Sequence, residues 1–309
     1  VADKRRKDVI VLRDRHGIKP ACLGWKDGNY CVASESIALR ENGAEFRHNL
    51  IPGHAYYLKS DGSFDKEKII DSSPRHCFFE WNYIADQNSL IDQLNVRVVR
   101  EMLGEKLAEE FNPKNIDILS YIPRCPESAA EGYARKRNME VTPLFYKMRS
   151  ERSFLGSNKE ARARSIGNNL YLLPGANEKV SGKDVVVIDD STIRGNVASR
   201  VRDLMNKAGA KSVCLANYTP MIGIVGDDGI PRGCLFGVDM PPDDNFIARN
   251  KTREEISKQI GMPIYYLSPG SMRDVFSGLG MNPGNLCTYC IGGENPLVSL
   301  KVNGKEIRS

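Results

Sequence analysis

The 309 residues are enough for roughly two domains of about 150 residues each, and an apolar content of 41% allows both to bury a core. With 44 basic and 39 acidic residues the net charge is +5, yet the basic residues are scattered except for a loop near 147–164. This pattern argues against a continuous basic surface that binds nucleic acid and favours a small anionic ligand. No run of about 18 apolar residues could span a bilayer, so we expect a soluble protein. Eight cysteines are too dilute for a disulfide scaffold and favour a reducing, cytoplasmic compartment.

The first 75 residues are predicted to be rich in strands. Short apolar runs are separated by Gly, Asp and Asn, the residue types of tight turns. We expect strands at 8–12, 21–25, 30–33 and 55–58 and a short helix after Ser34, through 37–39.

From about residue 77 the apolar spacing becomes helical and then alternates with strands. A helix is expected from Ser89 to Phe111. Strands are predicted at 116–122, 141–146, 184–189, 212–218 and 263–267, and helices at 127–136, 197–208 and through 272–276. Alternation of this kind predicts an α/β fold with a doubly wound parallel sheet.

The most informative segment runs from Val185 to Asn196. Four β-branched residues predict a strand that is buried on both faces, and Asp189 and Asp190 follow at its carboxyl end, where open α/β sheets bind ligands. A polar loop and a helix start come next, and the N–H groups of a helix start suit a phosphate. Because paired acids can accept hydrogen bonds from a vicinal diol or hold hydrated Mg²⁺, the segment indicates a site for ribose 5-phosphate. The alternative is a pair of solvent-facing acids or a receiver-type phosphorylation site.

The continuation Thr-Ile-Arg-Gly makes this segment resemble the phosphoribosyltransferases, and more closely the amidophosphoribosyltransferases, whose signature runs V-D-D-S-I-V-R-G-T-T. Further motifs follow the family in order, namely RDRHGIKP (13–20), VASESIAL (32–39), CFFEWNYIADQNSLID (77–92), GVDMP (237–241), RNKTREEISKQIG (249–261) and CTYCIGGENP (287–296). The resemblance implies part of an N-terminal-nucleophile (class II) glutaminase domain at 1–76 and a type I phosphoribosyltransferase fold at 77–309.

The resemblance also implies a reaction and its residues. Ammonia would displace pyrophosphate from phosphoribosyl pyrophosphate, with Mg²⁺, to give 5-phosphoribosylamine in the first step of purine biosynthesis. Asp189 and Asp190 would hold the ribose hydroxyls, and a basic loop would close over pyrophosphate, unless it is only a solvated charged loop. Homotetramers and inhibition by purine nucleotides are implied as well. The loop that would hold the 5-phosphate comprises Ser191, Thr192, Ile193, Arg194, Gly195 and Asn196, and the basic loop contributes Lys147, Arg149 and Arg152.

Three departures from the family pattern favour an alternative function. Pro123-Arg124-Cys125-Pro126 stands in place of P-D-S-G, and a proline lacks an N–H donor for pyrophosphate; the charge of Arg124 would have to compensate. Asn196 and Val197 replace two threonines, and the K-L-N-P run is not recognisable. The chain could therefore be a regulatory homologue that binds a phosphoribosyl ligand without turnover. An unrelated nucleotide-binding α/β protein is a remote third alternative.

The glutaminase nucleophile, an amino-terminal cysteine in the family, has no counterpart before RDRHGIKP. The chain begins at Val1, so we expect a truncated or diverged family member that does not hydrolyse glutamine by itself.

The spacing Cys287-Thr-Tyr-Cys290 suits metal ligands. The resemblance adds Cys77 and Cys234, which would complete a [4Fe–4S] ligand set, although Gly284 stands where the family often has a further cysteine. Zinc and unliganded thiols remain alternatives.

Overall fold

A computed structural model describes residues 2–3, 8–148, 169–297, 301–302 and 305–306. The chain divides into two compact units: unit 1 comprises 1–99, 276–289 and 293–309, and unit 2 comprises 100–275 and 290–292. The expected domain boundary after residue 76 therefore lies within unit 1, and the domain assignment stays a prediction. Within the described ranges, no helix is both long and apolar enough to cross a membrane.

Unit 1 is built mainly from two antiparallel sheets. Their strands form in the orders β1-β2-β6-β7 and β4-β3-β5, and the predicted strands at 8–12, 21–25, 30–33 and 55–58 are confirmed to within a residue or two. Buried Leu23, Tyr56 and Leu58 form an apolar cluster from strands of both sheets. The short helix α1 covers the other side of β3 through Leu39 and Cys22. The elements are β1 (Ala2–Asp3), β2 (Asp8–Leu12), β3 (Cys22–Lys26), β4 (Asn29–Ala33), α1 (Ser36–Glu41), β5 (Glu45–Asn49), β6 (His54–Leu58) and β7 (Phe64–Lys68).

The helix expected from Ser89 begins later, and its first residues form a hairpin instead. Asp92 and Gln93 both have positive φ, as a two-residue hairpin turn requires, and Leu94 pairs with Ile91. Asp92 is held there by two hydrogen bonds from buried Arg13, at 2.7 and 2.8 Å. The periodicity of this stretch was thus overridden by a tertiary ion pair. The elements here are β8 (His76–Cys77), the π-helix η1 (Glu80–Ile84), β9 (Leu90–Ile91), β10 (Leu94–Asn95) and α2 (Val96–Glu110).

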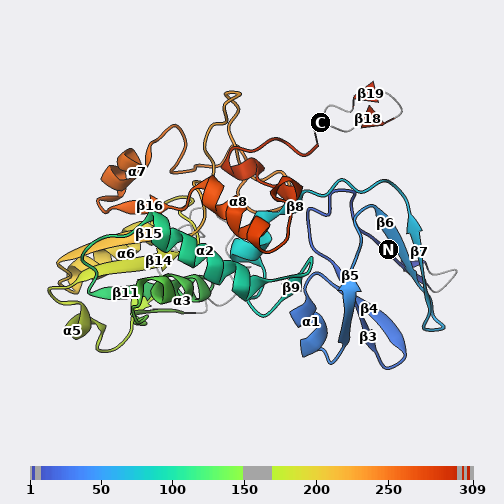
Figure 1. The fold of residues 1–309 in the computed structure, drawn as a ribbon, viewed down its shortest axis with the longest axis horizontal. Coiled ribbons are helices and arrows are strands. Elements are labelled where there is room, and N and C mark those ends of the chain that lie inside the picture. The colour runs from blue at the N-terminus through green and yellow to red at the C-terminus, as the bar shows by residue number, and fades with distance from the viewer. Residues whose placement is uncertain (1, 4–7, 149–168, 298–300, 303–304, 307–309) are drawn as a thin grey trace. The chain divides into compact units, whose positions relative to one another are not determined.

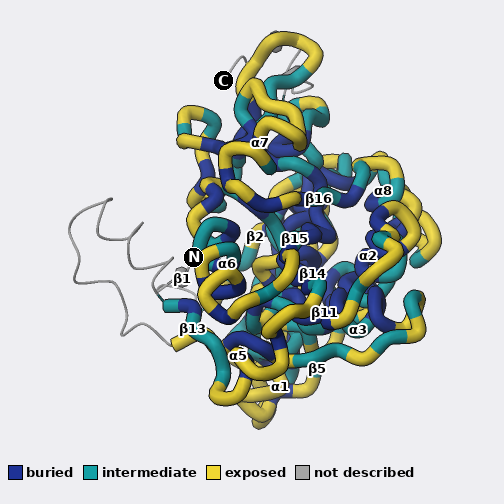
Figure 2. Tube along the Cα trace, turned by 90° about the vertical axis from the view of Figure 1, so that its left-hand side faces the viewer, coloured by how far each residue is buried: buried dark blue, intermediate teal, exposed yellow. Residues whose placement is uncertain are grey.

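Unit 2 is organised around a four-stranded parallel sheet in the order β11-β14-β15-β16 (Figure 1). Val185 and Val187 of β14 pack in one apolar cluster with α6. Val186 and Ile188, which alternate with them along the strand and point to the opposite face, are also buried, so β14 is covered on both faces (Figure 2). The predicted parallel α/β sheet is therefore confirmed. Its elements are β11 (Ile118–Tyr121), α3 (Pro126–Arg137), α5 (Ala176–Val180), β14 (Asp184–Asp189), α6 (Asn196–Lys207), β15 (Ser212–Asn217), α7 (Arg253–Ile260), β16 (Ile264–Tyr266) and α8 (Pro269–Gly278).

The predicted strand at 141–146 is only partly correct. Val141 makes a single bridge to Leu119, and the strand β12 (Phe145–Lys147) pairs instead with β13 (Leu170–Leu172). Pro143 has no N–H for a ladder in this stretch. The described chain ends with short elements: η3 (Pro283–Asn285), β17 (Leu286–Cys287), η4 (Tyr289–Ile291), β18 (Lys301–Val302) and β19 (Lys305–Glu306).

Candidate functional site

Two adjacent carboxyl groups lie at the carboxyl end of β14. Asp189 is the last residue of the strand and is 4% exposed, and one of its carboxylate oxygens accepts a hydrogen bond of 2.9 Å from the N–H of Asp190. The Ser191 hydroxyl donates to Asp190 at 2.6 Å. The central, four-residue apolar stretch of β14 explains this placement, since a fully buried strand delivers the next polar residues to the edge of the sheet.

Burial dominates the electrostatics of this pair. It raises the pKa of the Asp189 carboxyl well above its usual range, and the neighbouring charge of Asp190 raises it further. Burial also raises the pKa of Asp190 to about 6, against the opposing effect of the Ser191 hydrogen bond and of two nearby cations, Lys147 and Arg100. Two carboxyl groups that are costly to ionise favour a ligand that donates hydrogen bonds or carries positive charge.

The loop that follows presents a row of backbone donors. The N–H groups of residues 192 to 198 find no hydrogen-bond acceptor within the described part of the chain, and the first N–H to point into the helix is that of Ser199, which donates to Gly195. The N-cap Gly195 contributes no side-chain cap. Consecutive unpaired N–H groups at the start of a twelve-residue helix form an anion-binding nest.

Gly195 is required by the geometry of this loop. Its φ is +82°, and a Cβ built on it would lie 2.6 Å from Ile247 and 2.8 Å from Ile260. The close contact lets the Ile247 N–H donate to the Ile193 carbonyl at 2.8 Å. The Arg194 guanidinium forms an ion pair with Asp244 and donates to the Asp239 carbonyl at 3.3 Å. In this structure Arg194 therefore holds the loop to segment 237–250 instead of extending alone towards a ligand.

The other predicted site residues lie in different parts of the structure, and two of them are not described. Lys147, at the end of β12, acts electrostatically on both Asp189 and Asp190. Arg124 is exposed and immediately precedes Cys125, the residue before α3, and the peptide bond between Pro123 and Arg124 is cis. The predicted residues Arg149 and Arg152 lie outside the described residues.

Sequence reasoning missed three side chains beside the carboxyl pair. Arg100 is 1% exposed, Tyr218 is fully buried, and Cys125 is half-buried; all three interact electrostatically with Asp190. Arg100 had a detectable signal, because it occupies the apolar stripe of α2, four residues after buried Val96. A cation on such a stripe indicates a buried anionic partner. No comparable sequence signal identifies Tyr218 as a residue of the site.

The four predicted cluster cysteines are divided between the two units. Cys77 and Cys287 are register partners in unit 1, whereas Cys234 and Cys290 belong to unit 2. Burial raises the pKa of Cys77 to about 12, which disfavours the thiolate a metal needs. Across the described ranges, no group of three or more His, Cys, Asp or Glu side chains could hold a metal ion. The iron–sulfur cluster stays a prediction, and no step below uses it.

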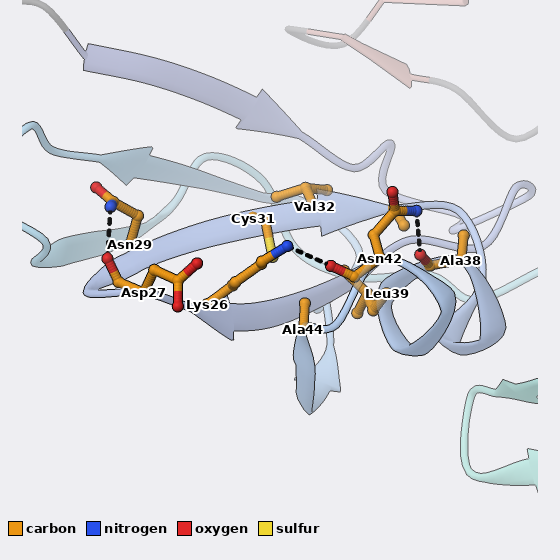
Figure 3. Close-up of a pocket in the computed structure, with 10 residues that line it drawn as sticks. Lys26, Asp27, Asn29, Cys31, Val32, Ala38, Leu39, Asn42 and Ala44 are labelled. Carbon is orange, nitrogen blue, oxygen red and sulfur yellow. Dashed lines mark hydrogen bonds between the residues drawn. The ribbon is translucent and has the colours of Figure 1, made fainter.

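A separate pocket of about 480 Å³ lies in unit 1 (Figure 3). It is lined mainly by apolar side chains, including Val32 and Leu39, and at one end Lys26 donates to the Asn42 carbonyl at 2.6 Å. None of the predicted site residues lines it. The pocket therefore adds nothing to the chemistry of the carboxyl pair.

No protein-family model matches the chain, but curated proteins do. It is 32% identical over 292 residues to the amidophosphoribosyltransferase of Archaeoglobus fulgidus, covering 94% of this chain and 61% of the relative. It is 32% identical over 265 residues to that of Escherichia coli, covering 82% of this chain and half of the relative. The chain thus spans only about half to three-fifths of these relatives.

A solved structure gives the same result. The glutamine phosphoribosylpyrophosphate amidotransferase of Bacillus subtilis, in complex with ADP and GMP, superposes with a TM-score of 0.80 at 26% identity, covering 94% of this chain and 62% of that one. Together with the parallel sheet of unit 2, this likeness confirms the predicted type I phosphoribosyltransferase fold.

Proposed function

Because the chain belongs to the amidophosphoribosyltransferase family, we propose that unit 2 binds phosphoribosyl pyrophosphate and transfers its phosphoribosyl group to ammonia. The product would be 5-phosphoribosylamine, as in the first step of de novo purine biosynthesis. The observation that carries the proposal is the placement of a carboxyl pair, buried Asp189 and half-buried Asp190, directly before a row of unpaired backbone N–H groups.

The N–H row supports binding of the 5-phosphate. Residues 192 to 198 supply donors from one short loop and the first turn of α6, where the helix dipole adds partial positive charge. Backbone donors do not depend on side-chain identity, so the replacement of the two signature threonines by Asn196 and Val197 leaves them in place.

The carboxyl pair supports binding of the ribose. Vicinal hydroxyls donate to ionised carboxylates, and such charge-assisted hydrogen bonds are about twice as strong as neutral ones. Because the pKa of Asp190 is about 6, its carboxyl is ionised at neutral pH, yet it lacks enough internal donors to offset its burial. A bound diol would supply those donors and lower the pKa.

In the transfer step the nitrogen lone pair of ammonia forms a bond to C1 of the ribose while the bond from C1 to the pyrophosphate oxygen breaks. The bonding electrons leave with pyrophosphate, and the new ammonium group releases one proton. Positive charge develops on the ribose, and the nearby Asp190 carboxylate stabilises it, with Asp189 adjacent. Lys147 stabilises the negative charge of the departing pyrophosphate. Mg²⁺, if bound, would neutralise part of that charge through phosphate oxygens.

We propose that this chain takes free ammonia as its nitrogen donor. Its two cysteines in the predicted glutaminase part, Cys22 and Cys31, both lie in strands, and burial raises the pKa of Cys22 to about 11. A thiol with so high a pKa is a poor nucleophile. Inhibition by purine nucleotides and assembly into homotetramers are further proposals; the Bacillus subtilis relative was solved with ADP and GMP.

One observation favours a binding protein without turnover. Pro126 begins α3, so this helix start lacks one N–H donor, and burial raises the pKa of the preceding Cys125 thiol. The stretch thereby offers fewer donors to pyrophosphate than the loop after β14 offers to the 5-phosphate.

Calorimetric titration with phosphoribosyl pyrophosphate and Mg²⁺, followed by an assay of pyrophosphate release, tests these proposals. We expect binding, and release with ammonium but not with glutamine. Asp184→Asn, at the other end of β14, is the matched control and should bind normally. Binding without release would support the binding protein, and no binding would overturn both. Phosphoribosylamine made from glutamine would refute the ammonia proposal.

A further inference from the structure

We infer that Thr192 and Asn217 are positioning residues, which hold the phosphate-binding loop in its binding-ready shape from the sheet side. The inference rests on the proposed function and adds to it the device that orders the loop. Thr192 was predicted as a substrate-binding side chain, but its hydroxyl donates to the Asn217 side-chain oxygen at 3.0 Å.

The Asn217 side chain is fixed in turn by the sheet. Asn217 ends β15 and is the register partner of Asp189 on one side and of Tyr266 on the other. Its side-chain amide donates to the Tyr265 carbonyl of β16 at 3.0 Å. The Thr192 hydroxyl is therefore hydrogen-bonded to the end of β15, next to Asp189 in the sheet.

The hydrogen bond between Thr192 and Asn217 affects the loop strongly because both side chains are buried. Thr192 is 5% exposed and Asn217 is fully buried, so neither group can exchange its partner for water. If the hydroxyl is removed, the Asn217 side-chain oxygen stays buried without a hydrogen-bond donor. The free-energy cost of that unsatisfied acceptor favours conformations in which the loop has moved. The loop would then present its N–H groups less often in the converging arrangement that a phosphate needs.

The loop has few other restraints of this kind. Its remaining contacts join the Ile193 carbonyl to the Ile247 N–H and the Arg194 guanidinium to Asp244 and to the carbonyl of residue 239, and all of them lead to segment 237–250. Only the Thr192 contact connects these loop side chains to the parallel sheet among the described hydrogen bonds. In the family signature quoted above, an isoleucine stands at this position, so the contact distinguishes this chain.

The test compares Thr192→Val, which keeps the shape and removes the hydroxyl, with Thr192→Ser, which keeps the hydroxyl. Ribose 5-phosphate and inorganic pyrophosphate are the two probes, measured by calorimetry. We expect Thr192→Val to weaken ribose 5-phosphate binding about tenfold and to leave pyrophosphate binding unchanged, and Thr192→Ser to restore the affinity. Asp184→Asn is the control, because it removes the contacts of Asp184 with Lys211 and Ser212 at the opposite end of β14 and lowers stability without touching the loop.

A second readout does not depend on any ligand. Trypsin can cut the loop between Arg194 and Gly195, and mass spectrometry follows that bond alone. Cleavage should be faster in Thr192→Val than in the unaltered chain or in Asp184→Asn. Unchanged cleavage in Thr192→Val, or an equal loss of affinity for both probes, would overturn the inference. Faster cleavage in a protein that does not bind ribose 5-phosphate would instead refute the proposed function and leave the loop-ordering role standing.

Discussion

Replacing Asp190 with asparagine should stabilise the unliganded protein while it abolishes ribose binding. Burial raises the pKa of Asp190 from 3.8 to about 6, so the folded state binds the proton more tightly than the unfolded state does. At low pH both states are protonated and the carboxyl costs nothing. Stability falls as the pH rises through the interval between the two values, and the loss is complete above about pH 6. The shift corresponds to a cost of roughly 2 kcal/mol at pH 5 and about 3 kcal/mol at pH 7.5.

Asparagine removes this cost and still accepts the Ser191 hydrogen bond through its side-chain oxygen. Urea unfolding of Asp190→Asn should therefore show a gain in the free energy of unfolding that is larger at pH 7.5 than at pH 5. The control Asp184→Asn should behave in the opposite way. The pKa of that carboxyl is lowered by hydrogen bonds from Lys211 and Ser212, so its loss removes a favourable interaction. A loss of stability in Asp190→Asn, or a gain independent of pH, would refute the reasoning.

Three further outcomes follow from the structure. Gly195→Ala should cost roughly 3 kcal/mol of stability, from positive φ and close contacts, whereas Gly182→Ala, with similar φ and open space, should cost about 1 kcal/mol in thermal unfolding. Arg194→Ala and Asp244→Asn should weaken ribose 5-phosphate binding by similar factors in calorimetry, since they break one ion pair; tighter binding in Asp244→Asn would show that a freed Arg194 binds phosphate directly. If the four predicted cysteines hold a cluster, anaerobically purified protein should contain iron and absorb near 400 nm; a colourless, iron-free protein would count against the cluster prediction.

The local part of the site could be predicted because its residues are neighbours in sequence. The run from Val185 to Asp190 specifies a buried strand that ends in acids, and Gly195 followed by an amphipathic helix specifies the start of α6. Each of these depends on side-chain type and on contacts over a few residues. The cysteine motif was equally visible, but the spacing of Cys287 and Cys290 says nothing about where distant thiols lie.

Arg100, Asn217 and the true start of α2 depended on long-range contacts. Arg100 and Asn217 are distant in sequence from the carboxyl pair, and only strand pairing and helix packing bring them beside it. The ion pair of Arg13 with Asp92 likewise turned a stretch of helical periodicity into a hairpin.

The sequence alone determined that this protein has a parallel α/β sheet with an acidic strand end and a loop that leads into a helix start, because propensity and burial pattern act locally. Tertiary structure alone decided that these acids have raised pKa values and that the Thr192 hydroxyl faces Asn217. The physical reason is that desolvation and buried hydrogen bonds depend on what surrounds a group in space.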